Sequence, residues 1–398
     1  MTGRKRYHTT GYLENNKASL VHGGKEYFPL LEQMILDAKK SIHLQTYIFS
    51  NDQTGSMVAG WLKAAAERKI EVYLLVDGYA SQSLPRDFID DLKRSGIHFR
   101  FFEPFLRTKT FYFGRRLHQK IVVADCAVAM VGGINIADRY NELPGDPAWL
   151  DFALQVQGDI VQELYQLCWK TWEGFPVRLK KILPQSQPVT NIPAEEKMKI
   201  RMRRNDWVRR KNEISLSYIS MLHGAQSHVT IMCSYFLPGR MIRKRMRQAV
   251  SRGVKLTLIS AGPSDVPVSK NAERWMYDWL LRNKITVYEY QPTVLHAKIS
   301  VCDDEWMTVG SYNVNNISAY ASIELNLDVK DERFAVSAGE MMQGIIDKDC
   351  KLITQESLTH TSSWRRFVNW CSYTFIRMMF FITTFYFRRT KINKHKAD

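Results

Sequence analysis

The sequence contains few cysteines, and no two of them form a close pair. The six cysteines among the 398 residues are Cys126, Cys168, Cys233, Cys302, Cys350 and Cys371. A disulfide framework or a zinc site is therefore not expected, and reduced thiols in a cytoplasmic setting are the simplest interpretation. No cluster of carboxylates or of histidines and cysteines indicates a metal either, so we expect neither a metal nor another cofactor.

Long apolar stretches are also missing before residue 360. The N-terminal segment MTGRKRYHTTGYLENN is basic, but no apolar core follows it, so we expect no signal peptide. We also expect no membrane-spanning helix before residue 360. Hydrophobic residues nevertheless make up 45% of the chain, a normal value for a folded protein, which argues against bulk disorder.

Acidic residues are fewer than basic ones. The chain has 40 Asp and Glu against 56 Lys and Arg, a formal net charge of +16. Such an excess suggests an anionic partner, either nucleic acid or an acidic membrane surface. The charge alone does not choose between the two.

The chain contains an internal repeat. The first half reads as a helix, YFPLLEQMILDAKK, a strand, SIHLQTYIF, a second helix, MVAGWLKAAAERK, and a second strand, IEVYLLVDG. The second half repeats this order with NEISLSYISMLHGA, HVTIMCSYF, RMIRKRMRQAVSRG and VKLTLISAG, and each half adds a further helix and strand. Alternating strands and helices predict an α/β fold. We expect two pseudo-symmetric halves, each a mixed or parallel sheet flanked by helices.

The domain boundaries follow from the repeat. We place the first half at residues 1–175 and the second at 198–350. Residues 176–197 contain four prolines and no periodicity, which predicts a linker. Residues 351–398 form a C-terminal tail.

A short motif occurs once in each half. The segments are LHQKIVVADCAVAMVGGIN and LHAKISVCDDEWMTVGSYN. They align His118, Lys120, Asp125, Gly133 and Asn135 with His296, Lys298, Asp303, Ser311 and Asn313, at identical spacing. One His-x-Lys pair could arise by chance on a strand, but duplication in register makes chance improbable.

The residue types in this motif suit phosphoryl chemistry. Residues two apart on a strand share a face, so each histidine should lie beside its lysine. Lysine and asparagine donate hydrogen bonds to phosphate oxygens, while histidine can serve as nucleophile or general acid. If the two halves pack face to face, both motifs form one site between them, in which two lysines neutralise the charge that a metal neutralises elsewhere.

Two further acids are candidate partners for the histidines. Asp151 and Glu324 are lone acids inside apolar, strand-like runs, 33 residues after His118 and 28 after His296. A buried carboxylate needs a partner, and a catalytic histidine needs its second nitrogen oriented. We therefore predict that these acids orient the histidines. A capped strand end is the alternative.

The double motif resembles the signature of the phospholipase D superfamily, HxKxxxxD followed by GG or GS and Asn. The segments QTYIFSND, GGIN and WLDF make the chain most similar to short bacterial cardiolipin synthases. The resemblance implies a two-step reaction in which His118 becomes a phosphohistidine and His296 acts as the general acid and base.

The resemblance also assigns the other motif residues. It implies that Lys120, Lys298, Asn135 and Asn313 hold the phosphoryl oxygens, and that Asp125 and Asp303 support the motif. Ser311 would join the phosphate contacts, whereas Gly133, which lacks a hydroxyl, could contribute only its backbone.

The implied substrates are phospholipids: phosphatidylglycerol, with phosphatidylethanolamine as a possible donor. The implied location is the cytoplasmic face of the bacterial inner membrane, with peripheral attachment.

The tail holds one long apolar segment, FVNWCSYTFIRMMFFITTFYF, at residues 367–387. It is long enough to span a bilayer, but Arg377 in its middle would cost about 2.5–3.5 kcal/mol there. Basic residues flank both ends, so we favour a helix lying in an anionic interface. A span or a core helix is the alternative. The expected membrane contacts are Trp364, Phe367, Trp370, Arg377 and Phe381.

Two other functions stay open. A hydrolytic phospholipase D would use the same chemistry. A metal-independent nuclease would use the net charge and the basic run KMKIRMRRNDWVRRK at 197–211, which could bind phosphate or be a solvated strand edge. The basic insertion at 105–116 could contact a headgroup or be a surface hairpin.

Because a nuclease needs no aromatic apolar tail, we expect no nucleic-acid partner. A non-catalytic membrane module would not need every motif residue.

Overall fold

The computed structural model describes residues 11–103, 115–174, 192–209, 211–315 and 322–394, with side chains up to Met379 in the last helix. Most of the predicted linker and of the insertion at 105–116 lie outside these ranges. The first half comprises β1 (Leu13–His22), α1 (Gly23–Asp37), β2 (Ser41–Thr46), α2 (Gln53–Glu67), β3 (Glu71–Asp77), α3 (Arg86–Arg94), β4 (His98–Phe102), β5 (Arg116–Leu117), β6 (Lys120–Ala124), β7 (Val128–Gly132), the 3-10 turn η1 (Asp138–Tyr140), β8 (Phe152–Gly158) and α4 (Asp159–Trp172).

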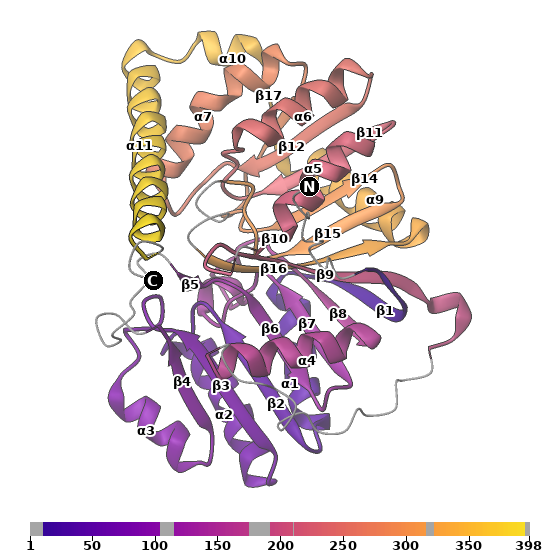
Figure 1. The fold of residues 1–398 in the computed structure, drawn as a ribbon, viewed down its shortest axis with the longest axis vertical. Coiled ribbons are helices and arrows are strands. Elements are labelled where there is room, and N and C mark those ends of the chain that lie inside the picture. Colours follow the sequence, from indigo (N-terminus) through magenta and orange to yellow (C-terminus); the bar gives the residue numbers. More distant parts are fainter. Residues whose placement is uncertain (1–10, 104–114, 175–191, 210, 316–321, 395–398) are drawn as a thin grey trace.

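The second half repeats this order (Figure 1). It comprises η3 (Ala194–Glu196), β9 (Met198–Asp206), β10 (Lys211–Asn212), α5 (Glu213–Gly224), β11 (His228–Cys233), α6 (Arg240–Ser251), β12 (Lys255–Ala261), α7 (Pro267–Arg282), β13 (Thr286–Tyr290), β14 (Lys298–Cys302), β15 (Trp306–Gly310), β16 (Ser322–Lys330), α9 (Glu332–Asp349) and β17 (Cys350–Ile353). Helices α10 (Gln355–Thr359) and α11 (Ser363–Lys394) follow.

Each half is built on a mixed sheet. Strands β2, β3 and β4 pair in parallel, and β6, β7 and β8 continue the sheet antiparallel. Strands β11, β12 and β13 and then β14, β15 and β16 repeat this arrangement. The parallel strands need crossover helices, and α2, α3, α6 and α7 supply them. The predicted α/β fold of two pseudo-symmetric halves is confirmed.

Two strands join the sheets. β1 pairs with β8, β9 pairs with β16, and β1 and β9 also pair with each other. Residues 198–206 of the basic run therefore form an interior strand instead of a solvated edge. Its apolar residues Ile200 and Met202 are buried, while Arg201 and Arg203 form ion pairs with the buried Asp328.

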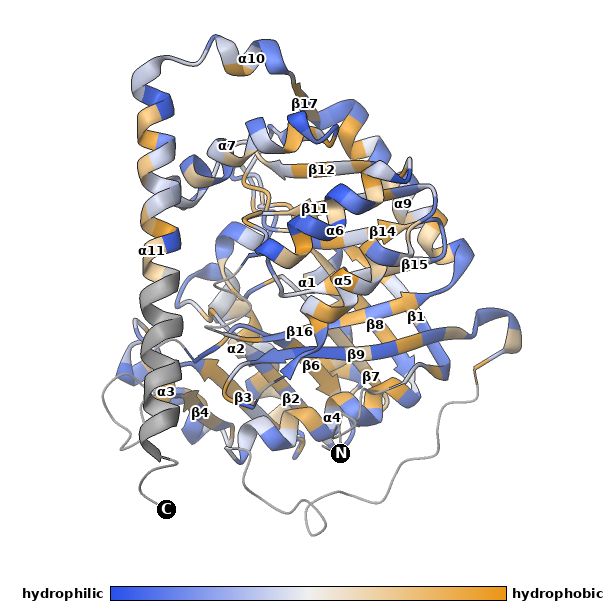
Figure 2. Ribbon diagram, turned by 45° about the horizontal axis from the view of Figure 1, so that its top comes forward, coloured by the Kyte–Doolittle hydropathy of each residue, from blue (hydrophilic) through white to orange (hydrophobic). Residues whose placement is uncertain are grey.

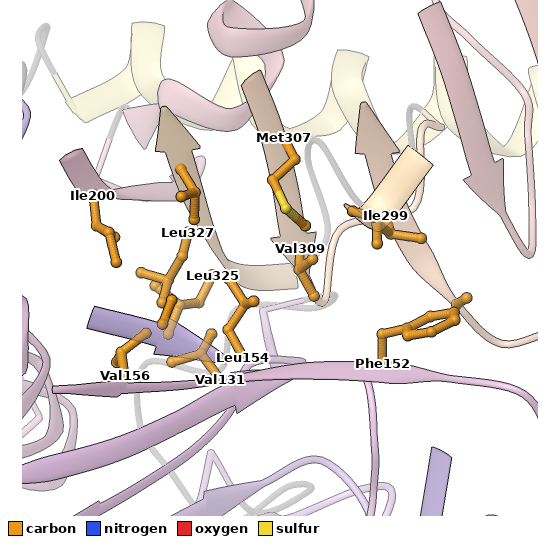
Figure 3. Packing of buried hydrophobic residues seen from close by; sticks show 14 of the residues in the cluster. Val131, Phe152, Leu154, Val156, Ile200, Ile299, Met307, Val309, Leu325 and Leu327 are labelled. Carbon is orange, nitrogen blue, oxygen red and sulfur yellow. The ribbon is translucent and has the colours of Figure 1, made fainter. Parts of the chain in front are cut away.

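The core lies between the inner faces of the two sheets (Figure 3). The first half contributes Val131, Leu154 and Val156, which meet Leu325 and Leu327 of the second half. Those of the first half alternate along β7 and β8 with residues such as Met130 and Ala153, which are buried in a second cluster on the other face of the sheet. The shared core fixes how the halves face each other.

Short backbone contacts also cross between the halves, next to the two motifs. β5 pairs in parallel with the start of β16, with Leu117 opposite Ile323. On the other side of the pseudo-symmetry, Leu150 forms a bridge with Leu295. Each motif histidine directly follows one of these contacts.

Helix α11 lies alongside α7 at the edge of the second half (Figure 1). Its described part mixes hydrophilic and hydrophobic residues along its length (Figure 2). Within the described ranges, no helix is apolar over enough residues to cross a bilayer. Strand β17 pairs with β13, so the sheet of the second half extends just past the boundary placed at residue 350.

Candidate active site

Each motif histidine is held at its backbone by the opposite half. The His118 N–H donates to the carbonyl of Ile323 over 3.1 Å, and the His296 N–H donates to the carbonyl of Leu150 over 2.8 Å. Both histidines stand just before a strand, β6 or β14, whose first residue is the motif lysine. The two motifs therefore face one site between the halves.

The imidazoles pair with carboxylates, and both pairs cross between the halves. His118 Nδ1 lies 2.9 Å from Glu324 Oε2, and His296 Nδ1 lies 2.6 Å from Asp151 Oδ2. The sequence picks out the two acids, each at a fixed distance after the histidine of its own half, but a pairing within each half is wrong: each acid contacts the histidine of the other half. With Nδ1 engaged by a carboxylate, Nε2 is the ring nitrogen left for chemistry. Each motif histidine therefore depends on a carboxylate from the other half.

The two carboxylates have different surroundings. Glu324 also accepts hydrogen bonds from the hydroxyls of Ser311 and Ser322. Although burial raises its pKa, His118, Lys120 and Ser311 outweigh burial and hold the pKa of Glu324 below its ordinary value. Within the described part of the chain, Asp151 accepts the N–H of Phe152 besides its histidine contact, and burial raises its pKa to about 6.

The motif lysines are buried and each points back at its own histidine. Lys120 Nζ donates to the carbonyl of His118 over 2.7 Å, and Lys298 Nζ donates to the carbonyl of His296. Burial and the charge of Lys298 lower the pKa of Lys120 to about 7, and burial lowers that of Lys298. Burial also lowers the pKa of both histidines, and the lysines add to the effect.

This concentration of cationic groups in a desolvated space is costly when the site is empty. A bound anion would offset their mutual repulsion and favour their protonated forms. The site is therefore suited electrostatically to a phosphodiester.

The motif asparagines differ in their contacts. Asn135 is buried, and its amide donates to Tyr140 Oη and accepts the N–H of Ile48. Asn313 Oδ1 accepts the hydroxyl of Ser234, and no protein acceptor for its NH₂ group is found among the described residues. Asn313 therefore has the freer donor for a phosphate oxygen.

The motif aspartates Asp125 and Asp303 act on the backbone. Asp125 accepts the N–H groups of Lys39, Lys40 and Ser41 at the start of β2. Asp303 accepts those of three consecutive residues, 226–228, at the start of β11. Each carboxylate thus ties its motif hairpin to the neighbouring strand at the hairpin's turn.

Comparison with known protein families identifies the family to which the chain belongs. The family model described as "Cardiolipin synthase, PLD-like domain" matches residues 31–167 and 218–346, one segment in each half. The chain belongs to this family. Cardiolipin synthase B of Shigella flexneri is 31% identical over 370 residues, which cover 92% of this chain and 88% of the relative. Cardiolipin synthase A of Pseudomonas syringae is 29% identical and covers 87% and 71%.

Solved structures agree on the fold. The phosphatidylserine synthase of Haemophilus influenzae superposes with a TM-score of 0.71 over 93% of this chain and 95% of that one, at 14% identity. The resemblance to the phospholipase D superfamily, and within it to cardiolipin synthases, is confirmed. The chain is thus an enzyme of the phosphatidyltransferase type.

Ser311 and Gly133 occupy the same position of the family motif, and each lies beside a carboxylate. The hydroxyl of Ser311 donates to Glu324 and accepts the N–H of Leu325. At Gly133, an added Cβ would lie 2.3 Å from Asp151 Oδ1. Each residue accommodates the carboxylate beside it: serine donates to it, and glycine leaves it space.

Substituting Gly133 by alanine should therefore disturb His296. The new methyl group must displace the Asp151 carboxylate, and a misplacement of about 1 Å in a catalytic group can lower the rate about 10²-fold. We expect a loss of this size in kcat, measured as cardiolipin formed from phosphatidylglycerol. Gly60→Ala is the matched control, because nothing lies within 4 Å of its added Cβ; equal losses in both variants would contradict the account.

The depressed pKa of Lys120 predicts a pH dependence. The ammonium is present below about pH 7 in the free enzyme and is lost above it, so kcat/KM should fall as pH rises through this range, by up to about tenfold per unit. Lys120→Arg, which stays charged, should flatten this alkaline limb even if its overall rate is lower. An unchanged limb in this variant would assign the ionisation to another group.

Several residues near the histidines were not singled out from the sequence. The ring of Tyr47 lies 4.9 Å from that of His118, with Lys120 Nζ 5.2 Å from its centre. Tyr140 lies 5.3 Å from the ring of His296. The internal repeat could have indicated Tyr47, because the segment TYIF in the first half aligns with SYF in the second and both contain a tyrosine. Tyr140 lies in a non-periodic loop that gives no such signal.

Proposed function

We propose that this chain transfers a phosphatidyl group from one phospholipid to a hydroxyl of another, forming cardiolipin through a phosphohistidine on His118. The observation that carries the proposal is the crossed pairing of the two histidines with carboxylates in one cationic site. Membership of the cardiolipin synthase family supports the same reaction.

In the first step, Nε2 of His118 attacks the donor phosphorus, and the bond from phosphorus to the headgroup oxygen breaks. His296 gives a proton to the departing alcohol. The ionised Glu324 stabilises the positive charge that develops on His118. Lys120, Lys298 and the amide of Asn313 bind the equatorial oxygens as charge builds on them.

In the second step, His296 removes the proton from the incoming hydroxyl, whose oxygen attacks the phosphorus. The phosphorus–nitrogen bond breaks and His118 is restored. His296 must be protonated at the start, although burial and the two lysines hold its pKa well below its ordinary value. The negative charge of the bound phosphodiester among the surrounding cations raises that pKa and resolves the conflict.

The proposed substrates are phosphatidylglycerol as acceptor and phosphatidylglycerol or phosphatidylethanolamine as donor. The paired charges of β9 argue against the nuclease alternative. Besides Arg201 and Arg203, which pair with Asp328, Lys199 pairs with Glu14. Much of the basic run is thus neutralised within the protein and is not presented to a polyanion.

The enzyme should meet its lipids through α11, attached peripherally to the cytoplasmic face of the bacterial inner membrane. Trp364, Phe367 and Trp370 are 72%, 51% and 45% exposed, and Arg377 is exposed further along. Exposed aromatics with nearby arginines suit an anionic interface. Asn369 is buried. The side chain of Phe381 lies outside the described residues.

Replacing Trp364, Phe367 and Trp370 together by alanine should weaken binding to vesicles containing phosphatidylglycerol by tenfold or more, because each buried aromatic contributes roughly 1.5–3 kcal/mol. Cosedimentation measures this directly. The matched control replaces the exposed Leu36, Leu216 and Leu352, which lie on other elements. Equal binding by both triple variants would show that α11 is not the contact.

The function itself is tested by product analysis. Purified protein with phosphatidylglycerol vesicles, with and without a chelator, should yield cardiolipin and free glycerol in equal amounts. Phosphatidic acid as the sole lipid product would identify a hydrolase instead. Degradation of DNA at a comparable rate would favour the nuclease.

A further inference from the structure

Arg139 is an exposed arginine on the His296 side of the site. It lies in η1, four residues after Asn135, and its guanidinium carbon stands 4.8 Å from the centre of the Trp149 ring. The N–H of Trp149 donates to the carbonyl of Arg139 over 2.8 Å. Stacking on tryptophan fixes the plane of the guanidinium and leaves its N–H edge available to a ligand.

Arg139 is tied to His296 through short contacts. The N–H of Leu150, next to Trp149, donates to the carbonyl of Val294, and the N–H of His296 donates to the carbonyl of Leu150. The Trp149 ring lies 6.0 Å from that of His296. The charge of Arg139 also contributes to lowering the pKa of His296, so the two groups interact electrostatically.

The guanidinium of Arg139 has no carboxylate partner within the described residues. By contrast, Arg201 and Arg203 each pair with Asp328. The neighbouring Asp138 carboxylate instead accepts the N–H of Thr54. An uncompensated guanidinium beside a reaction centre is suited to an anionic ligand.

Arg139 also breaks the pseudo-symmetry of the chain. The position aligned with it in the second motif, four residues after Asn313, is Ile317, which lies outside the described residues. The motif residues recur in both halves, but this cation occurs only in the first. A ligand of Arg139 would therefore lie beside only one of the two histidines. That histidine is His296, which takes the proton from the incoming alcohol.

We propose that Arg139 and Trp149 form a binding site for the phosphodiester of the acceptor phospholipid. This inference rests on the proposed function. An acceptor phosphatidylglycerol carries its own, unreacting phosphodiester one glycerol unit away from the attacking hydroxyl. When that hydroxyl lies at His296 Nε2, the second phosphate must lie just beyond it. Water and small alcohols bring no such anion, so Arg139 favours transfer to a lipid over hydrolysis.

The test is a partition experiment with vesicles of phosphatidylglycerol in dilute ethanol. The phosphatidyl-enzyme then reacts with lipid, ethanol or water, giving cardiolipin, phosphatidylethanol or phosphatidic acid. The sum of the three products reports the first step, and their ratio reports acceptor choice. Arg139→Ala should lower the ratio of cardiolipin to phosphatidylethanol about tenfold to a hundredfold, as expected for losing a charged hydrogen-bonded contact, and should change the sum by less than about threefold. Arg139→Lys should fall between.

The control is Arg333→Ala, an exposed arginine on α9 beyond the far end of β16 from Glu324; it should leave both readouts unchanged. An unchanged ratio in Arg139→Ala, or an equal fall of all three products, would overturn the assignment, since the residue would then serve the donor or the fold. Failure of the proposed function looks different: the wild-type protein itself would form no cardiolipin.

Discussion

Replacing His118 by alanine should lower the rate of cardiolipin formation by about 10⁴-fold or more, a loss typical of removing a catalytic nucleophile. In the proposed reaction His118 forms the covalent bond to phosphorus, and His296 is needed as the acid and base. The partition products should disappear together, because all three arise from the same phosphatidyl-enzyme. The measurement is a time course with purified variant and phosphatidylglycerol vesicles, after circular dichroism has shown that the variant is folded.

His296→Ala provides the contrast. Its proposed task is to protonate the departing alcohol, so the variant should be severely impaired with phosphatidylglycerol but much less so with a p-nitrophenyl phosphodiester, whose leaving group needs no proton. His118→Ala should be inactive on both. Recovery of His118→Ala, and not of His296→Ala, on the activated substrate would exchange the two roles.

Glu324→Gln should lower kcat by about 10³–10⁴-fold, although Glu324 lies in the other half from the nucleophile that it serves. The amide cannot stabilise the imidazolium that forms during attack, and it favours the wrong tautomer; the corresponding loss in a serine protease triad is about 10⁴-fold. The effect should fall on formation of the phosphatidyl-enzyme, measured as glycerol released in the first turnover. The burial and hydrogen bonds of Glu324 make this pairing specific.

Asp328→Asn is the matched control for this variant. Asp328 is buried on the same strand, β16, but pairs with Arg201 and Arg203 instead of a histidine. Its substitution should lower the melting temperature and leave kcat at 25 °C within a few fold. If both variants lost activity in proportion to stability, Glu324 would be a structural residue only.

Much of the fold and site could be predicted from the sequence because the motif is duplicated. The alternation of strands and helices gave the mixed sheets, and identical spacing placed the two histidines in equivalent positions. β1 was missed since LENNKASLVH offers few apolar residues in alternation; it is stabilised by its partners β8 and β9 instead.

The side-chain contacts of the motif residues could not be predicted from the duplicated motif. The crossed pairing of Glu324 with His118 depends on β5 lying against β16, a tertiary contact between segments about 200 residues apart. The difference between Gly133 and Ser311 resembled a lost phosphate contact, and only the positions of the carboxylates reveal its steric reason. Arg139 and Trp149 lie in irregular chain, where no periodicity predicts a neighbour.

The most direct test of the central claim is to locate the covalent intermediate. The protein would be incubated with phosphatidylglycerol, quenched in alkali, where phosphohistidine survives, digested and mapped by mass spectrometry. We predict a phosphatidyl or lipid-derived phosphoryl group on His118, which is missing in His118→Ala. A label on His296, or cardiolipin formed at full rate with no labelled histidine, would contradict it.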